Sequence, residues 1–400
     1  MFSLTISPLV WALLGGGVLA AIIAWVAGFI PLGKIYAFAK KEEEEELPEV
    51  PQNYGRASIV VFSNTEQQEI EDYLRELSKQ DYPDFEAIVV VEGTHRMAEA
   101  LREAYKEEFP WARFTFIPPE NRNISLKKLA YTLGTKAATG DIVFTAQLNC
   151  RYASPHWLSM MMRHFDDKKI GIVLGYASLE YDEMKGLKRW FREFDSLLIN
   201  CRWIASAIMS RPYRGDGANL AFRKQLFFEV GGYGSTYFLH PGDDDIFICE
   251  IASIRNTAVE TDPRAHVKLC CGSESAQMWI EQKESREFTS HYLPVLPRLR
   301  TQIYHLFNWI MTGLYVAAAI IALPNLVPMF IALALMLAFW GVEIWQYRRI
   351  APIFGALRLW WGVPLFFLLS PVANVLFRLR YSKRHIHNYT WQRPNRRRRF

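Results

Sequence analysis

Short apolar runs alternate with amphipathic segments between residues 57 and 146. Four runs have the length of buried strands: residues 58–62, 87–91, 114–117 and 142–145. Three intervening segments carry apolar side chains at helical spacing: residues 66–79, 96–108 and 125–139. Continuous apolar strands that alternate with such helices indicate a parallel sheet covered on both faces. The pattern therefore predicts an α/β fold.

Polar side chains follow three of these strands directly. Ligands of parallel sheets bind beyond the carboxyl ends of the strands. The candidate ligand-binding residues at these positions are Ser63, Thr65, Glu66, Glu92, Gln147 and Asn149.

Both ends of the chain are strongly apolar. Residues 8–30 contain no charge, which is enough length to cross a bilayer as a helix. A secretory signal is the alternative, but nothing basic precedes the run and it is too long for the apolar core of a signal peptide. Lys34, Lys40 and Lys41 follow it, which predicts an uncleaved anchor with the next domain in the cytoplasm. The glutamates at 42–46 indicate a solvated linker.

Three further apolar runs precede a basic C-terminus. Residues 303–323 and 326–345 predict a helical hairpin that returns to the cytoplasm at Arg348 and Arg349. Residues 359–377 are interrupted by Pro371, and a spanning helix there would place nine basic residues outside. We therefore favour a re-entrant or interfacial segment over a third spanning helix. The basic tail should bind anionic lipids; RNA is the weaker alternative, and no nucleic-acid partner is expected.

Composition agrees with a cytoplasmic membrane protein. Apolar residues make up 50% of the 400 residues, and the net charge is +5. The five cysteines show no paired spacing, which favours a reducing compartment and argues against a zinc site.

Three consecutive acids, Asp243, Asp244 and Asp245, follow Gly242 and precede the apolar residues 246–249. Crowded carboxylates repel one another, so at least one pKa should rise, as suits a general base or a group that meets a cation. The alternative is a helix N-cap, where aspartate is favourable against the helix dipole.

Several motifs occur in a characteristic order along the chain. They are QDYP at 80–83, KKLAYTLG at 127–134, Cys150 with Arg151, GANLAFRK at 217–224, GDDD at 242–245 and WIEQ at 279–282. With its flanking helices, the segment from residue 58 to about residue 297 resembles membrane-anchored family 2 glycosyltransferases of the GT-A fold, and looks most similar to a branch typical of Bacteroidetes.

The resemblance implies a Rossmann-like GT-A domain with transmembrane helices at both ends, in the bacterial inner membrane. The expected divisions are an anchor at 1–36, an acidic linker at 37–56, the cytoplasmic transferase domain at 57–300, a membrane region at 301–378 and a basic tail at 379–400.

The resemblance also implies roles for individual residues. Asp244 would be the general base, supported by Asp243 and Asp245. The nucleotide-sugar would contact the strand-end residues and Lys128. Three residues would support the donor and acceptor: Asn219, Gln282 and Arg286.

The chain departs from the family pattern on the donor side. Glu92 replaces an aspartate, and Gln147 and Asn149 replace both acids of the Asp-x-Asp metal motif. Thr65 stands where the family has asparagine, and Ser285 takes the place of an arginine. Amides offer a dication only neutral oxygens, so Mg²⁺ or Mn²⁺ should be weakly bound, with Asn149 as a candidate ligand, or absent. The lost charge could be replaced by fixed cations, for which the candidates are Lys127, Lys128, Arg214 and Arg223.

The expected function is inverting transfer of a sugar from a nucleotide-sugar to a lipid-linked or membrane-proximal acceptor. The alternative is an inactive pseudo-glycosyltransferase that senses a nucleotide-sugar or binds a partner protein. A polymer-exporting synthase is a third hypothesis, but three or four membrane helices are few for an export channel.

Overall fold

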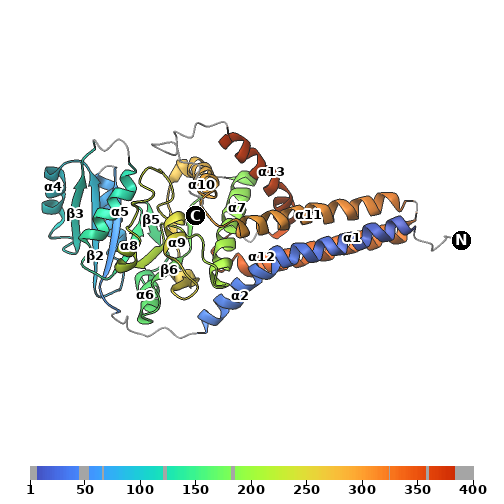
Figure 1. Ribbon diagram of the computed structural model, residues 1–400, viewed down its shortest axis with the longest axis horizontal. Coiled ribbons are helices and arrows are strands. Elements are labelled where there is room, and N and C mark those ends of the chain that lie inside the picture. Colours follow the sequence, from blue (N-terminus) through green and yellow to red (C-terminus); the bar gives the residue numbers. More distant parts are fainter. Residues whose placement is uncertain are drawn as a thin grey trace.

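The computed structural model describes residues 7–44, 54–64, 67–119, 124–181, 185–323, 325–356 and 360–382. A globular α/β domain carries an arm of three long helices (Figure 1). The arm consists of α1 (Pro8–Ala24), α11 (Val295–Ile321) and α12 (Leu326–Ile350). The globular domain contains the sheets and the shorter helices.

The main sheet has seven strands in the order β3-β2-β1-β4-β8-β6-β9. Their bounds are β1 (Ala57–Ser63), β2 (Phe85–Glu92), β3 (Ala112–Ile117), β4 (Ile142–Ala146), β6 (Ile172–Gly175), β8 (Leu220–Arg223) and β9 (Thr257–Glu260). The first four strands pair in parallel, at the positions that the apolar runs predict. The sheet as a whole is mixed, because β8 is antiparallel to both β4 and β6.

Helices cover both faces of the sheet, and β1 shows why its apolar run is continuous. Ile59 and Val61 pack with α3 (Gln67–Leu77) and α4 (His95–Tyr105), whereas Val60 packs on the other face with α5 (Leu126–Ala137). All three side chains are fully buried. Strands buried on both faces have no polar positions, which is the pattern seen in the sequence.

A small second sheet lies beyond the carboxyl end of β4. It contains β5 (Cys150–Tyr152), β10 (Val267–Leu269) and β7 (Ala177–Leu179), in the order β5-β10-β7. The chain passes from β4 into β5 through residues 147–149, and the backbone N–H of Cys270 donates to the carbonyl of Asn149. This sheet thus holds the segment that follows β4 against the rest of the domain.

Two helices connect the sheet to the arm. The first is α7 (Gly186–Ile208), a core helix packed against β9 and α2. The second is α10 (Ser275–Thr289), which precedes α11. The remaining helices of the domain are α6 (Trp157–Met162), α8 (Lys224–Glu229) and α9 (Asp245–Ile251).

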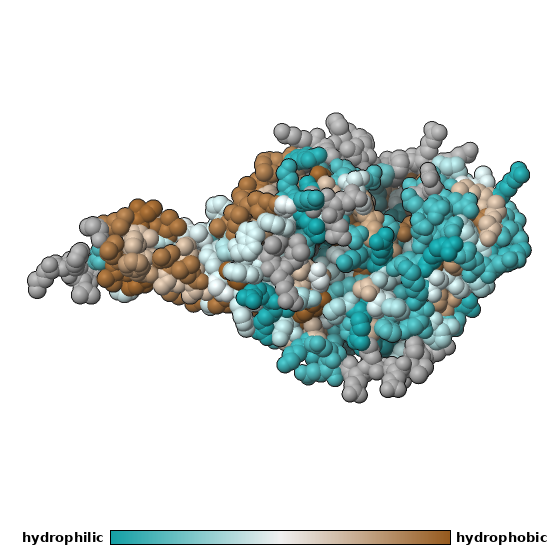
Figure 2. All heavy atoms as spheres, turned by 180° about the vertical axis from the view of Figure 1, so that it is seen from behind, coloured by the Kyte–Doolittle hydropathy of each residue, from teal (hydrophilic) through white to brown (hydrophobic). Residues whose placement is uncertain are grey.

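Four helices are long and apolar enough to cross a membrane: Pro8–Glu43, Val295–Ile321, Leu326–Ile350 and Trp360–Arg380. Apolar residues gather on the surface of the projecting arm, while the globular domain is mainly hydrophilic (Figure 2). The first of these helices continues from α1 through a π-helical turn, Trp25–Phe29, into α2 (Ile30–Glu43). Gly28 lies in that turn, where a Cβ would come within 2.2 Å of the Tyr304 ring, so glycine permits α11 to approach closely.

The last helix, α13 (Val363–Ser382), runs away from the arm beside α10 and α7 (Figure 1). One face of α13 exposes apolar side chains at helical spacing: Leu365, Leu369, Val372, Leu376 and Leu379. The opposite face contacts the globular domain through polar bonds. Asn374 accepts from the Lys283 ammonium at 2.7 Å, and Arg378 lies 2.9 Å from Glu287.

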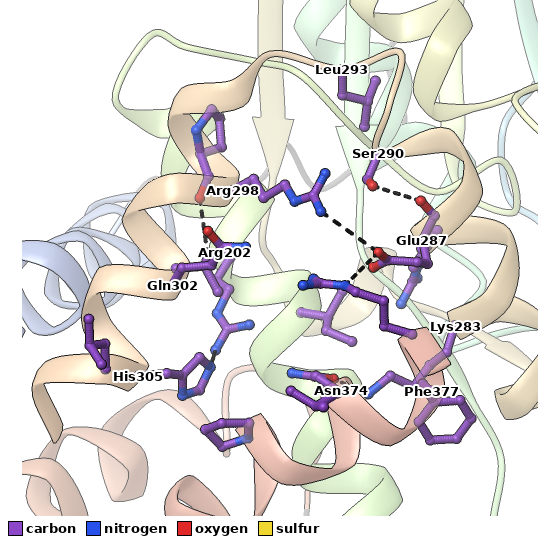
Figure 3. Close-up of a pocket in the computed structure, with 18 of the residues that line it drawn as sticks. Arg202, Lys283, Glu287, Ser290, Leu293, Arg298, Gln302, His305, Asn374 and Phe377 are labelled. Atoms are coloured by element: carbon purple, nitrogen blue, oxygen red, sulfur yellow. Dashed lines mark hydrogen bonds and ion pairs between the residues drawn. The ribbon is translucent and has the colours of Figure 1, made fainter. Parts of the chain in front are cut away.

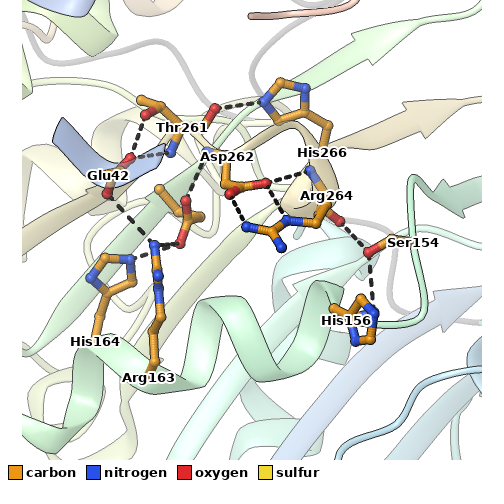
Figure 4. Close-up of polar contacts among 10 residues, drawn as sticks. Glu42, Ser154, His156, Arg163, His164, Thr261, Asp262, Arg264 and His266 are labelled. Atoms are coloured by element: carbon orange, nitrogen blue, oxygen red, sulfur yellow. Dashed lines mark hydrogen bonds and ion pairs between the residues drawn. The ribbon is translucent and has the colours of Figure 1, made fainter. Parts of the chain in front are cut away.

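The end of α2 is bonded to the globular domain by Glu42 (Figure 4). Its carboxylate accepts hydrogen bonds from the backbone and hydroxyl of Thr261. Glu42, His164 and Glu260 come close enough to suggest a metal site. However, Arg163 already supplies a cation, 3.0 Å from Glu260 and 3.9 Å from Glu42. We therefore interpret the cluster as a structural contact between the anchor helix and the domain.

Candidate functional site

The three consecutive acids lie at the start of α9. Gly242 has a φ of +92°, a conformation that favours glycine, and it turns the chain into the acid triplet. Asp244 is the N-cap residue of α9 and accepts from the backbone N–H of Asp245 at 2.6 Å. It also accepts from the backbone N–H of Gly217 at 3.4 Å, which joins it to the segment before β8. The helix-cap role is therefore real, but two backbone donors leave the carboxylate capacity for more.

The three acids have different surroundings. Asp243 is buried, and its Oδ2 lies 2.7 Å from the ammonium of Lys127. Asp245 is buried and lies 3.2 Å from Arg214, while the hydroxyl of Thr289 donates to it. Among the described residues Asp244 makes no ion pair, and it is the only member of the triplet that is partly exposed. Asp244 is thus the carboxylate of the three that an incoming molecule can reach.

These surroundings move the pKa values of the two neighbouring acids in opposite directions. Burial and the charges of Asp245, Asp243 and Asp216 raise the pKa of Asp244 to about 7. Although burial opposes it, the Lys127 ammonium holds the pKa of Asp243 below its usual range. A carboxyl whose pKa lies near neutrality can take up a proton and release it again at physiological pH.

Lys127 and Lys128 are adjacent in the sequence but face different surroundings. Lys128 is fully buried, and its ammonium donates to the carbonyls of Thr236 and Pro241 at 2.9 and 2.8 Å. Lys127 pairs with Asp243 while 36% of its side chain stays exposed. The geometry therefore favours Lys127 as the cation that faces the site, with Lys128 holding the loop ahead of the triplet.

One face of α10 contributes to the same site. Arg286 lies 3.7 Å from Asp216, and Thr289 bonds to Asp245. Lys283, one turn earlier on this face, is buried in an ion pair with Asp195 at 2.8 Å. Gln282 precedes Arg286 by four residues and Thr289 by seven, so it lies on the same face of α10, but it forms no hydrogen bond or ion pair with the triplet within the described part of the chain. Of the two α10 residues that the sequence singles out, only Arg286 bonds within the acid network of the described residues.

Two residues that the motif comparison did not single out, Asp216 and Thr289, belong to this network together with the candidate cation Arg214. Asp216 accepts from the backbone N–H of Ala218 and raises the pKa of Asp244, while Arg214 and Thr289 bind Asp245. The adjacent Arg-Gly-Asp-Gly motif was a visible signal for Arg214 and Asp216. Nothing in the sequence pointed to Thr289, because its hydrogen bond to Asp245 depends on how α10 is rotated about its axis.

The expected donor side lies at the carboxyl ends of β1, β2 and β4. Parallel pairing of β1 with both neighbours brings Ser63, Glu92 and Gln147 to one edge of the sheet. Ser63 is buried, whereas Glu92, Gln147 and Asn149 are partly exposed. Thr65 and Glu66, which were also expected here, lie outside the described residues.

Asn219 is a buried structural residue. Its amide accepts from the Trp157 indole at 2.9 Å and donates to the carbonyls of Tyr176 and Ala265. These bonds join β8 to three other segments. Because its polar atoms are already hydrogen-bonded within the protein, the Asn219 side chain serves to hold the backbone in position.

The donor side fits a divalent metal poorly. Gln147 and Asn149 offer neutral amide oxygens, and the amide nitrogen of Asn149 donates to the Cys271 sulfur at 3.3 Å. Mg²⁺ and Mn²⁺ favour carboxylate oxygens, so the observed set of ligands lacks the charge that would hold such an ion tightly. The other cations that the sequence offered differ in position: Arg214 is at the triplet, whereas Arg223 donates to the carbonyls of Ile170 and Phe165 in the interior.

A large cavity adjoins the acid triplet on the side of the arm. Its volume is about 770 Å³, and it lies between α7, α10, α11 and α13. Arg214 and Arg286 line the cavity and also bind Asp245 and Asp216. The acids and the cavity therefore share a wall.

Comparison with known proteins agrees with this architecture. Residues 58–232 match the family model described as Glycosyl transferase family 2. A glucosyl-dolichyl phosphate glucuronosyltransferase of Haloferax volcanii is 22% identical over 181 residues, or 44% of this chain, and the match spans 56% of that relative's length. The solved structure of a mannosyltransferase from Pyrobaculum calidifontis, in complex with GDP-Man and Mn²⁺, is similar with a TM-score of 0.51 and 19% identity. That alignment covers 90% of this chain and 99% of the other, and it supports the GT-A fold.

Proposed function

Because residues 58–232 match the model of glycosyl transferase family 2, we propose that this chain is a membrane-bound, hexosyltransferase-like glycosyltransferase. It moves a sugar from a nucleotide-sugar to a lipid-linked or membrane-proximal acceptor. The observation that carries the proposal is Asp244, a partly exposed carboxylate with a pKa of about 7 beside a GT-A sheet. The curated relative supports a lipid-linked acceptor, since its name describes a sugar on dolichyl phosphate.

The proposed reaction inverts the configuration of the transferred sugar. The acceptor hydroxyl gives its proton to Asp244 while its oxygen forms a bond to the anomeric carbon of the donor. The bond from that carbon to the diphosphate oxygen breaks, and its electron pair leaves with the nucleoside diphosphate. One base opposite one leaving group is sufficient for this displacement.

The departing diphosphate needs positive charge nearby. We assign this role to Lys127, which starts α5 at the carboxyl end of the sheet and is partly exposed. Its pairing with Asp243 fixes the ammonium beside the acid triplet. A bound Mg²⁺ or Mn²⁺ would add Lewis-acid stabilisation of the diphosphate, but the two amides support weak binding at most.

Several side chains support a cytoplasmic position for the catalytic domain in the bacterial inner membrane. The guanidinium of Arg349 lies 3.6 Å from the centre of the Tyr36 ring and 4.3 Å from that of Trp345. Aromatic and basic residues of this kind mark the cytoplasmic boundary of a bilayer. We place α13 in that interface, with its exposed apolar stripe in the lipid and its polar face on the domain. The basic tail, beyond the described residues, would bind anionic lipids.

The second candidate function is a pseudo-glycosyltransferase that binds a nucleotide-sugar or a partner without transfer. The two amides at Gln147 and Asn149 favour it, because they remove the usual metal ligands. The organised acid triplet opposes it, since a scaffold has no need of a partly exposed carboxylate that titrates near neutrality.

A binding and turnover assay separates the two candidates. Detergent-purified full chain is titrated with UDP, GDP and their sugars, with and without Mn²⁺, and thermal shift and donor hydrolysis are measured. We expect binding of one nucleotide class with little dependence on Mn²⁺, and slow hydrolysis of its sugar. Binding without hydrolysis or transfer favours the pseudoenzyme, and failure to bind any nucleotide contradicts both candidates.

A further inference from the structure

The cavity between α7, α10, α11 and α13 is polar at one end and apolar at the other. Near the globular domain its walls carry Arg202, Arg298 and Lys283 (Figure 3). Farther along α11 the lining changes to Leu306 and Trp309, which are 56% and 48% exposed. The α13 wall contributes exposed valine and leucine side chains in the same way. From Arg298 to Trp309 the helix rises about 16 Å, which is the scale of a lipid headgroup with the start of its chain.

Positive charge at the polar end is not fully compensated. Six cationic side chains line the cavity: Arg202, Arg214, Lys283, Arg286, Arg298 and Arg378. Four carboxylates pair with them, namely Asp195, Asp216, Asp245 and Glu287, which leaves an excess of two positive charges among the described residues. Such an excess beside an apolar groove favours an anionic amphiphile over a neutral one.

Arg202 and His305 are the groups with unused hydrogen-bonding capacity. Arg202 forms no ion pair within the described part of the chain, and its guanidinium donates to Nε2 of His305 at 2.7 Å. Because arginine stays protonated, the histidine accepts at Nε2 and carries its proton on Nδ1. His305 is 6% exposed, and its Nδ1 has no hydrogen-bond partner among the described residues. A buried donor without an acceptor, next to an arginine without a carboxylate, matches the needs of a phosphate oxygen.

We propose that this cavity binds the phosphate-bearing headgroup of a lipid acceptor, with the phosphate at Arg202, His305 and Arg298. The lipid chain lies along the groove between α11 and α13. This inference rests on the proposed function, which makes the bound lipid an acceptor. Arg214 and Arg286 connect the cavity to the acid triplet. It adds to that function the chemical class of the acceptor and the residues that select it.

A binding experiment with the full chain in phosphatidylcholine nanodiscs tests the proposal without requiring turnover. Farnesyl phosphate carries both features that the cavity fits, farnesol lacks the phosphate, and inorganic phosphate lacks the chain. We expect farnesyl phosphate to bind at least about tenfold more tightly than either, because the phosphate forms charge-assisted hydrogen bonds and the chain buries apolar surface. Equal binding of farnesol, or equal competition by inorganic phosphate, would overturn the proposal.

Matched variants locate the site. Arg298→Gln removes a partly exposed cation from the cavity and should weaken farnesyl phosphate binding about tenfold. Arg202→Gln should do the same, although its interior position makes misfolding a risk that Arg298→Gln avoids. Arg348→Gln is the control, since Arg348 is an exposed cation at the end of α12 that is absent from the lining of this cavity. An equal loss in Arg348→Gln indicates attraction to the charged surface and contradicts a cavity site.

Two further measurements are needed. One distinguishes a lipid acceptor from bulk anionic lipid, and the other tests this inference separately from the proposed function. Phosphatidylglycerol in the nanodisc should leave farnesyl phosphate binding nearly unchanged; full displacement would show a site for bulk anionic lipid and overturn the acceptor assignment. UDP and GDP binding is measured on the same preparation. Farnesyl phosphate binding that depends on Arg298, in a protein that binds no nucleotide, would support the cavity and contradict the transferase.

Discussion

The donor and acceptor sides of the proposed active site differ in how much charge they keep. Beyond the carboxyl end of β4, the amides Gln147 and Asn149 stand where the family resemblance implies the two acids of a metal motif. At the start of α9, three carboxylates are retained and two of them are matched by cations, with 2.7 Å between Lys127 and Asp243. The difference suggests that a base can remain organised after its metal site is lost, because neighbouring lysine and arginine side chains hold the acids in place.

The largest expected effect is on the base itself. Asp244→Asn removes the proton acceptor but keeps an oxygen for the backbone donors of Gly217 and Asp245. Transfer and donor hydrolysis should fall by about 10²–10⁴-fold, with nucleotide affinity nearly unchanged. Steady-state kinetics and nucleotide titration measure the two separately. Asp141→Asn, at an exposed acid before β4, is the matched control, and full activity in Asp244→Asn would remove the assignment.

The second largest effect is expected from restoring the missing carboxylates on the donor side. The double variant Gln147→Asp, Asn149→Asp gives the donor side two anionic oxygens for a dication. Mn²⁺ should then tighten nucleotide binding about tenfold or more, while it has little effect on the parent protein. Calorimetry with and without Mn²⁺ measures the change. Ser273→Asp, which adds an acid at an exposed turn, should show no such response.

Lys127 links the two sides, so its loss should affect both. Lys127→Met should weaken nucleotide binding by about tenfold, because a charge-assisted contact to the diphosphate disappears. It should also move the acidic limb of the pH–rate profile to higher pH, since this ammonium lowers the pKa of Asp244. Lys136→Met, an exposed lysine on the same helix, is the control. If the nucleotide affinity changes but the acidic limb of the pH–rate profile does not move, Lys127 does not act on the triplet.

The smallest expected effect is in the pH profile of the unmodified protein. The pKa of Asp244 is raised to about 7, so the base form is present above that pH and is lost as the pH falls through it. The value of kcat/KM should therefore decline on the acidic side with a midpoint near pH 7. The limb should be absent from the residual activity of Asp244→Asn. A midpoint near pH 4 in the unmodified protein would show that Asp244 is not the group that titrates.

The first half of the fold could be predicted from the sequence because three of its first four strands, β1, β2 and β4, are buried on both faces, while β3 is only partly buried. The runs that became these strands are mainly apolar, and that property is visible without a structure. The antiparallel β8 was not expected. Its four residues, Leu220–Arg223, lie inside a motif, and their partners β4 and β6 are fixed by tertiary pairing.

The acid triplet could be located in advance because it stands between Gly242 and the apolar residues 246–249, unlike the glutamates at 42–46. The partners of those acids were harder to assign. Lys127 and Lys128 are neighbours in sequence but about 100° apart on α5, so the phase of the helix decides which one meets Asp243. On α10, Gln282, Arg286 and Thr289 share one face, and of these Arg286 and Thr289 bond to the acid network in the described part of the chain. Sequence spacing within a motif does not determine where the helix begins.

The bond between Glu42 and Thr261 has a consequence for the height of the active site above the bilayer. The α2 helix has 14 residues, or roughly 21 Å of rise, and it continues from the anchor without a break. A single residue inserted into α2 would lift the domain by about 1.5 Å and rotate Glu42 by about 100° away from its partner. In the proposed function, the length of this helix therefore sets how far the lipid-borne acceptor must protrude to reach Asp244.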